Sequence, residues 1–251
     1  VQNQLFLIDC GEGTQLQLAK NHVKINRINN IFISHLHGDH FFGLMGLIST
    51  MHLYGRQKPL QIFGPTGLSE IITLQLRYSE SNLNFKIKLH ELEDNAPARI
   101  FENEFMTVET IPLSHRVFCN GFLFREKPKP RKINKEKLPE NFTLKNILKL
   151  KRGEDIVDDN DRIIYKNGEL TLPPKKSHAY AYCSDTSYKE DIVEQIKNVD
   201  LLYHESTFMD DMLERAEKTY HSTARQAATI AGKASVGKLI LGHYSVRYKD
   251  L

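Results

Sequence analysis

One short stretch constrains this chain more than any other feature. Residues 34–40 read SHLHGDH and directly follow a short apolar run, residues 31–33. Side chains two positions apart in an extended chain lie on the same face, so His35 and His37 can bind one cation together. A lone histidine is usually an ordinary surface or core residue. Histidines at this spacing, at the end of a predicted strand, instead indicate a metal site.

The second half of the stretch supplies a second pair of ligands. Gly38 allows the chain to turn, and Asp39 and His40 are then expected at the start of the next helix. A second cation can be bound there, beside the first. Imidazole and carboxylate ligands suit zinc, although manganese and iron also fit them. We therefore predict a two-metal site.

Three further titratable residues share one sequence context, because each comes just after an apolar run that reads as a strand. They are His115, Asp185 and His243. Each of them alone could be an ordinary polar residue at the end of a loop. Together they supply the number of ligands that a site for two metal ions needs.

Two other polar motifs stand where proton transfer could take place. HEST, residues 204–207, ends an apolar run, and HST, residues 221–223, opens a predicted helix. A glutamate that orients a histidine is a proton-transfer pair, so Glu205 and His221 are candidates if the fold brings them together. The alternative is that Ser222 caps the helix and Glu205 is a solvated acid.

Strand-like and helix-like segments alternate along the chain. Strands are predicted at residues 4–8, 31–33, 60–63, 85–92, 105–113, 179–183, 201–203 and 238–241, and helices at 14–20, 41–54, 68–77, 189–197, 211–218 and 223–233. This alternation indicates α/β layers rather than a helical bundle or a β-sandwich. A chain of 251 residues is long enough for one large domain or for one domain with an insertion.

A basic segment interrupts this alternation. Residues 125–152 hold 11 lysines and arginines against 3 glutamates, and residues 153–170 hold 6 acidic against 2 basic residues. Such a run is usually a solvated loop, but a basic arm could also bind a phosphate backbone. The net charge of the whole chain is only +3 and does not itself point to a nucleic acid. We predict an inserted arm at 125–177 between two parts of one domain, 1–124 and 178–251.

The cysteines and the hydropathy bear on the compartment. Cys10, Cys119 and Cys183 lie in apolar stretches and form no CxxC pair, so we expect buried thiols and a cytoplasmic location. The sequence has no run of about 18 apolar residues, and we expect no membrane span. It shows no signal peptide and begins without Met inside a strand pattern, so we expect both ends to be incomplete.

The motifs of this chain resemble those of RNase Z, the tRNA 3′-processing endonucleases of the metallo-β-lactamase superfamily. The resemblance runs over nearly the whole chain, through LIDCGEGTQ (7–15), SHLHGDHFFGL (34–44), IFGPTGL (62–68), PLSHRV (112–117), YCSDT (182–186), HESTF (204–208), HSTA (221–224) and LGHYSVRY (241–248). The HxHxDH pattern alone is typical of the superfamily. The HEST and HST boxes in this order, followed by HYS and Arg247, are much more specific to RNase Z. The resemblance implies an αββα sandwich with a basic exosite arm between His115 and Asp185.

The resemblance also implies a role for each candidate residue. One zinc ion would be bound by His35, His37 and His115, a second by Asp39, His40 and His243, and both by Asp185, with Asp39, Glu205 and His221 acting in catalysis. Two zinc ions per subunit are implied, and manganese is the alternative. The candidates for RNA binding are Arg247, Lys127, Lys129, Arg131, Lys132 and Lys135.

The activity implied is removal of the 3′ trailer from precursor tRNA, which leaves a 3′-hydroxyl on the tRNA and a 5′-phosphate on the trailer. A homodimer is implied, in which the arm of one subunit serves the active site of the other; no other protein partner is implied. Two alternatives stay open: a phosphodiesterase of the same fold with a non-tRNA substrate, and a non-catalytic RNA-binding module.

The sequence departs from the family pattern in three places. Ser206 replaces the alanine of the family's HEAT-type box, which leaves Glu205 intact. Residues 138–150 lack the Gly-Pro motif that the family's arm usually carries. The glycine-rich loop expected on an earlier strand is absent from the sequence, which puts its contribution to RNA positioning in doubt.

Overall fold

The computed structural model describes residues 4–94 and 96–249. The chain forms two units. The first consists of Val1–Glu102, Thr107–Phe124 and Ala179–Leu251, and the second of Asn103–Met106 and Arg125–His178.

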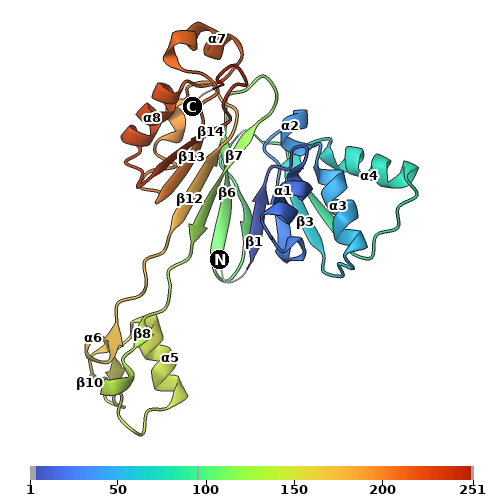
Figure 1. Ribbon diagram of the computed structural model, residues 1–251. Helices are drawn as coiled ribbons and strands as arrows, with labels where there is room; N and C mark the ends of the chain where they lie inside the picture. The colour runs from blue at the N-terminus through green and yellow to red at the C-terminus, as the bar shows by residue number, and fades with distance from the viewer. Residues whose placement is uncertain (1–3, 95, 250–251) are drawn as a thin grey trace. The chain divides into compact units, whose positions relative to one another are not determined.

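A sheet of four parallel strands begins the first unit. Its strands follow the order β1 (Leu5–Ile8), β2 (Ile28–Phe32), β3 (Leu60–Pro65) and β4 (Ile87–Leu92). The neighbouring helices are α1 (Thr14–Lys20), α2 (Gly38–Phe41), α3 (Leu44–Leu53) and α4 (Leu68–Tyr78), with a 3₁₀ turn, η1, at Ile25–Arg27 (Figure 1). Apolar residues of the strands pack with those of α3 and α4 in one buried core, as the predicted helical spacing requires.

A second, six-stranded sheet completes the first unit. Its order is β14-β13-β12-β7-β6-β5, with β5 (Arg99–Glu102), β6 (Met106–Pro112), β7 (Asn120–Glu126), β12 (Ala179–Cys183), β13 (Leu201–Glu205) and β14 (Leu239–Gly242). The helical elements near it are η3 (Glu190–Ile192), η4 (Asp210–Met212), α7 (Leu213–Lys218) and α8 (Ala224–Lys233). Helix α8 packs on β13 and β14 and buries Ile230 and Ala231 in a second core.

Phenylalanine side chains join the two sheets. Phe32 of β2 stacks on Phe63 of β3 with ring centroids 4.8 Å apart, and it meets Phe122 and Phe124 of β7 at 5.4 Å. Aromatic contacts at these distances stabilise a core beyond the area that they bury. The layers are therefore helix, sheet, sheet and helix, and the predicted αββα sandwich is confirmed.

The helix predicted at residues 189–197 is wrong. Only Glu190–Ile192 forms a 3₁₀ turn, η3, and the residues after it continue in turns. Ile192 and Ile196, which set the helical spacing, are both buried in the second core. The spacing of the apolar residues therefore predicted correctly which side chains are buried. Successive turns can bury side chains at this spacing without forming a regular helix.

Two glycines let the segment after β1 lie against the His-rich stretch. The amide of Cys10 donates to the carbonyl of His40 at 2.7 Å, and the amide of Gly43 donates to the carbonyl of Cys10 at 2.9 Å. A Cβ atom on Gly43 would lie 2.0 Å from the carbonyl oxygen of Gly11, and one on Gly11 would lie 2.0 Å from that of Asp39. Side chains at these positions would push the two segments apart.

We expect Gly43→Ala to lower the free energy of unfolding by about 1–3 kcal/mol, because backbone atoms must move to admit the methyl group. Urea unfolding of the purified variant measures this loss. Gly232→Ala in α8 is the matched control, since a Cβ atom there meets nothing within 4 Å and alanine favours a helix. Equal stability of Gly43→Ala and the wild-type protein would contradict the close approach.

The second unit has a small core of its own. It contains β8 (Lys132–Ile133), η2 (Lys135–Lys137), α5 (Leu144–Arg152), β9 (Ile156–Val157), β10 (Ile163–Tyr165), α6 (Asn167–Leu170) and β11 (Thr171–Leu172). Leu150, Ile156 and Leu170 are buried together. The side chain of Asn167 donates to the carbonyls of Leu150 and Glu154 at 2.8 and 3.0 Å and so ties α5 to α6. The basic segment is thus folded.

Two further observations concern the hydropathy of the helices and the surroundings of the cysteines. Among the residues that the structure describes, no helix has the length and apolar character needed to cross a bilayer. The three cysteines are free and buried, as predicted. Burial raises the pKa of the Cys183 thiol to about 12, which favours the uncharged thiol.

Candidate metal centre

The seven predicted ligands follow the ends of strands in the first unit. The His-rich stretch comes after β2, and His115, Asp185 and His243 come after β6, β12 and β14. Polar side chains at the carboxyl ends of strands commonly converge at one edge of α/β layers. Here they do so, and the seven divide between two groups that could each hold a metal ion: one of four residues that includes Asp185, and one of three.

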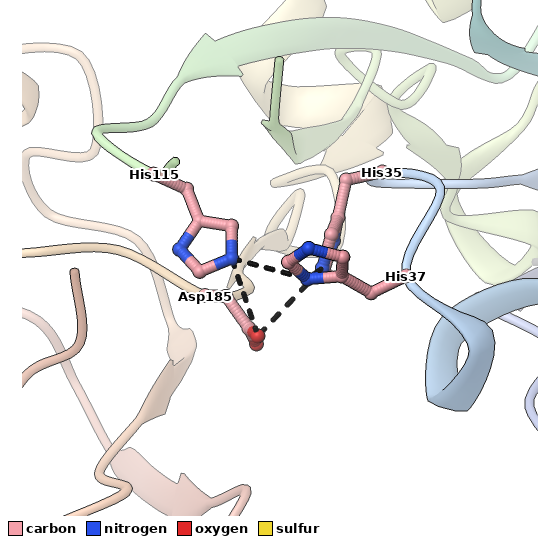
Figure 2. A group of neighbouring side chains, drawn as sticks. All are labelled: His35, His37, His115 and Asp185. Carbon is pink, nitrogen blue, oxygen red and sulfur yellow. Dashed lines mark hydrogen bonds and ion pairs between the residues drawn. The ribbon is translucent and has the colours of Figure 1, made fainter. Parts of the chain in front are cut away.

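The first group joins three imidazoles. The Nδ1 atom of His37 lies 3.0 Å from Nε2 of His35 and 3.2 Å from Nε2 of His115. The Oδ2 atom of Asp185 lies 3.7 Å from Nε2 of His35 and 3.9 Å from Nε2 of His115. Figure 2 shows the four side chains directed at a common point.

The second group lies on the other oxygen of the same carboxylate. Oδ1 of Asp185 is 3.4 Å from Nε2 of His40 and 3.4 Å from Nε2 of His243. Oδ2 of Asp39 is 3.5 Å from Nε2 of His40 and 3.4 Å from Nε2 of His243. Asp185 therefore presents one oxygen to each group, which is the arrangement of a bridging carboxylate.

The donor atoms fit a divalent cation. Ligands about 2.0–2.2 Å from a tetrahedral zinc ion lie about 3.3–3.6 Å apart, and the spacings in the first group run from 3.0 to 3.9 Å. Nε2 of His40 and Oδ1 of Asp185 are buried without a hydrogen-bond partner among the described residues. A buried polar atom without a partner costs about 1–3 kcal/mol, and a shared cation would remove that cost.

The other ring nitrogen of most of these histidines is held by a hydrogen bond to an acceptor. The partners are the Ser34 hydroxyl for His35 at 2.9 Å, Asp9 for His40 at 2.8 Å, the Tyr220 carbonyl for His115 at 2.9 Å and the Thr207 hydroxyl for His243 at 2.9 Å. Such bonds fix the tautomer and direct the other nitrogen at a metal.

Asp9 is a site residue that the sequence analysis missed. Its carboxylate accepts hydrogen bonds from the amide and hydroxyl of Ser34 at 2.8 and 2.9 Å and from the Tyr182 hydroxyl at 2.9 Å, besides its contact with His40. Its backbone has a φ of 56°, a conformation that non-glycine residues adopt mainly where the surroundings enforce it. The signal was present, because Asp9 directly follows β1 just as the other site residues follow their strands.

The charges of the site favour bound positive charge. Burial works against a proton on His40, but Asp185 and Asp9 outweigh it and raise the pKa of His40 to about 10. Burial alone would raise the pKa of Asp185, yet His40 and His243 hold it well below its usual value. Burial and the neighbouring His40 lower the pKa of His35 to about 2, so His35 is neutral and able to bind a metal.

Glu205 and His221 form the predicted pair. Oε1 of Glu205 lies 2.8 Å from Nδ1 of His221, and the carboxylate is fully buried. Its Oε2 accepts from the amide and the hydroxyl of Thr207 at 2.9 and 2.7 Å. The reading of Glu205 as a solvated acid is therefore wrong.

The helix-cap reading of Ser222 is also wrong. Thr223 caps α8 by accepting from the amide of Gln226, and the Ser222 hydroxyl donates instead to the carbonyl of Thr186 at 2.7 Å. Ser222 and Thr223 of the HST box therefore both anchor the chain beside His221. This anchoring fixes the imidazole at the edge of the metal site.

The electrostatic surroundings of His221 favour its protonated form. Burial works to lower its pKa, but the hydrogen bond and charge of Glu205, with the charges of Asp185 and Asp39, raise it above its usual value. A histidine held in this way can donate a proton. His221 also forms a group with Asp185 and His243 that could hold a metal ion, so the geometry alone allows a second role.

The predicted RNA-binding residues lie outside these groups. The exposed Arg247 donates to the hydroxyl of Ser245, in its own loop, at 3.4 Å. In the second unit, Lys129 pairs with Glu126 and Arg131 donates to the Thr171 hydroxyl. The other three arm candidates, Lys127, Lys132 and Lys135, belong to the same unit.

Comparison with known proteins identifies the relatives of this chain. Residues 1–135 match the family model described as Anti-Pycsar protein Apyc1. A ribonuclease Z of Cytophaga hutchinsonii is 53% identical over 250 residues, which cover 100% of this chain and 80% of the relative. A ribonuclease Z of Bacteroides fragilis is 47% identical over 251 residues, 100% of this chain and 82% of the relative.

A solved structure agrees with these sequence relatives. The crystal structure of human tRNase Z, short form, is similar with a TM-score of 0.74 and 29% identity, over 98% of this chain and 84% of that one. The resemblance found from the motifs is thereby confirmed. Sequence identity along the whole chain and a shared αββα sandwich together show that this chain belongs to the ribonuclease Z family, phosphodiester-hydrolysing endoribonucleases of the metallo-β-lactamase fold.

Proposed function

We propose that this protein is a zinc-dependent endoribonuclease that removes the 3′ trailer from precursor tRNA. The observation that carries the proposal is the Glu205–His221 pair at the edge of a seven-ligand cluster, in a chain whose full length matches proteins named ribonuclease Z. The cluster accounts for hydrolysis of a phosphodiester. The pair accounts for a leaving group that needs a proton, as the ribose oxygen of RNA does.

The proposed metal ligands follow the two groups. One cation would be held by His35, His37 and His115, the other by Asp39, His40 and His243, and Asp185 would contact both. The mixed imidazole and carboxylate donors support zinc, and manganese is the alternative. When bound, the two cations supply Lewis-acid charge beside the phosphate and make water acidic enough to yield hydroxide at neutral pH.

The chain's own residues would handle the protons. Asp39, whose side chain is 62% exposed, can orient the attacking water and accept its proton. His221 donates its Nδ1 proton to Glu205 in a hydrogen bond, so its Nε2 would protonate the departing 3′ oxygen of the tRNA's last nucleotide. Arg247 would offset negative charge on the phosphate. The products would be a tRNA with a 3′-hydroxyl and a trailer with a 5′-phosphate.

The direct test is cleavage of a 3′-extended precursor tRNA, with both new ends mapped, in the presence and absence of a chelator. We expect one cut after the discriminator nucleotide, a 3′-hydroxyl on the tRNA, loss of cleavage with chelator and recovery with zinc. Cleavage that survives complete metal removal would contradict the proposal.

The competing function is hydrolysis of a phosphodiester that is not tRNA. The family model described as Anti-Pycsar protein Apyc1 matches only residues 1–135 and so does not extend to Glu205 or His221. The relatives named ribonuclease Z cover both residues. Rapid hydrolysis of a simple diester without any cut in precursor tRNA would favour the competing function.

The second unit is proposed to bind the tRNA through its positive charge. Replacing Lys127, Lys132 and Lys135 together with glutamine should raise KM for precursor tRNA far more than it lowers kcat, because phosphate contacts contribute to binding away from the reacting atoms. The salt dependence of binding should also weaken, by roughly 0.7–0.9 in slope for each phosphate that the variant no longer neutralises.

Lys189, Lys197 and Lys238 of the first unit provide a matched triple-glutamine control with the same change in net charge. Unchanged binding by the arm variant, or equal weakening by both variants, would show that the second unit is not an RNA-binding arm.

A homodimer is also proposed. Large apolar side chains are exposed on the helical layer over the first sheet and in its loops; these are Leu16, Phe42, Leu53, Tyr54 and Tyr78. Leu16 and Tyr54 line one hollow, and exposed apolar residues that lie together are typical of association surfaces. We expect light scattering of the purified protein to give twice the chain mass of 29.0 kDa, and Leu53→Glu to shift it towards the monomer. A monomeric wild-type protein would contradict the dimer.

We further propose a cytoplasmic location. The three cysteine thiols are buried and free, which suits a reducing compartment. Fractionation of cells that express the tagged full-length protein would test this, and recovery outside the cytoplasm would contradict it.

A further inference from the structure

One of the five ligand histidines differs from the rest in the group that faces its outer nitrogen. In the other four, this nitrogen faces an oxygen acceptor, which belongs to Ser34, Asp9, the backbone of Tyr220 or Thr207. The fifth, His37, faces a cation: Nη2 of Arg116 lies 2.9 Å from its Nε2. Burial and this neighbouring positive charge together lower the pKa of His37.

This contact does not suit a histidine that binds metal through its other nitrogen. Nδ1 of His37 is the atom directed at His35 and His115, so Nδ1 is the ligating atom. A neutral imidazole that ligates through Nδ1 carries its proton on Nε2. The guanidinium of Arg116 has only donors, so two donors would then face each other without an acceptor between them.

Arg116 has no carboxylate to neutralise it. Within residues 4–94 and 96–249, no salt bridge joins its guanidinium to an aspartate or glutamate, and the side chain is exposed. An exposed guanidinium beside an N–H group, with no acceptor of its own, is a suitable partner for an oxyanion. Phosphate oxygens match the planar donor set of arginine, which can bind two of them at once.

We propose that Arg116 and the Nε2–H group of His37 together bind a backbone phosphate of the RNA substrate, next to the phosphate that is cleaved. The inference rests on the proposed function, since it takes His37 as a metal ligand and RNA as the substrate. Nε2 lies on the edge of the ring away from the ligating Nδ1, so this phosphate lies outside the metal pair. Arg116 would therefore position the RNA, while hydrolysis itself takes place at the neighbouring linkage.

Comparison of two substrates tests this assignment. Precursor tRNA offers neighbouring phosphates, whereas bis(p-nitrophenyl) phosphate offers one phosphate and no neighbour. For Arg116→Met we expect kcat/KM on precursor tRNA to fall about tenfold or more, as for loss of one charged hydrogen-bonding group. Hydrolysis of the small diester and the zinc content should both stay within about twofold of wild type.

Two further variants sharpen the comparison. Arg116→Lys keeps the charge but not the planar pair of donors, so it should recover part of the loss. Arg77→Met, an exposed arginine of α4, is the matched control and should behave as wild type on both substrates. Binding of precursor tRNA can be measured in a His221→Ala background over a range of salt concentrations. The slope of log K against log salt concentration should become roughly 0.7 less steep with Arg116→Met.

Each result decides the inference. Full activity of Arg116→Met on precursor tRNA, with wild-type cleavage intact, overturns the inference and leaves the proposed function standing. An equal loss on both substrates, or a loss of zinc, also overturns it, because Arg116 would then act only by holding His37. A wild-type protein that hydrolyses the small diester but neither binds nor cuts precursor tRNA contradicts the proposed function as well.

Discussion

Replacing Asp185 by asparagine is expected to remove metal binding and turnover together. The carboxylate presents Oδ2 to His35 and His115 and Oδ1 to His40 and His243, so one substitution weakens both groups. Asparagine has nearly the same volume but no charge. Cations at such sites supply several kcal/mol of transition-state stabilisation, and a loss of about 4 kcal/mol corresponds to about 10³-fold in rate.

Metal analysis after dialysis and hydrolysis of bis(p-nitrophenyl) phosphate together measure this effect. His37→Ala should behave in the same direction, since it removes one ligand of the first group. Asp191→Asn, in the η3 turn, is a control that removes a carboxylate elsewhere in the first unit. Circular dichroism in the presence of chelator checks that each variant folds. A folded Asp185→Asn protein with full metal content and turnover would rule out the bridging role.

Replacing His221 by alanine should have the second largest effect and a different signature. Removal of a general acid costs about 10²–10⁴-fold in rate, whereas the seven ligands of the two groups remain. We therefore expect slow cleavage of precursor tRNA at wild-type zinc content. Glu205→Gln should also slow the cleavage of precursor tRNA, because the hydrogen bond between Glu205 Oε1 and His221 Nδ1 holds the pair together.

A change of leaving group separates proton donation from every other role of His221. p-Nitrophenolate leaves without a proton, so His221→Ala should hydrolyse bis(p-nitrophenyl) phosphate at close to the wild-type rate. The group formed by Asp185, His221 and His243 could alternatively hold a metal ion. In that case the variant would lose zinc and both activities. His22→Asn, an exposed histidine after α1, is the matched control. Full activity of His221→Ala on precursor tRNA would exclude it as the proton donor.

Sequence patterns predicted the local elements that carry the site. The strand at Ala179–Cys183 has the predicted bounds, and α8 begins at its threonine cap, because apolar spacing and capping are properties of neighbouring residues. The HxHxDH stretch also predicted its two pairs of ligands, since it fixes which side chains share a face. The helix predicted at 189–197 failed because burial at helical spacing does not require a helix.

The contacts that make the ligands a site could not be predicted in this way. Tyr182 reaches Asp9 across 173 positions of sequence, and the carbonyl of Tyr220 reaches His115 across 105. No local pattern reports such contacts, because they depend on how two sheets pack. Asp9 and Arg116 were missed for this reason, although each stands next to a strand end or a predicted ligand.

The sequence by itself determined the kinds of donor available, their places after the strands, and the family to which they belong. Only the tertiary structure decided which nitrogen of each imidazole turns inward, that Asp185 gives one oxygen to each group, and that Glu205 is buried against His221. The physical reason is one of range. Residue type and spacing act over a few residues, whereas orientation is imposed by hydrogen bonds and packing between segments that meet only in the folded chain.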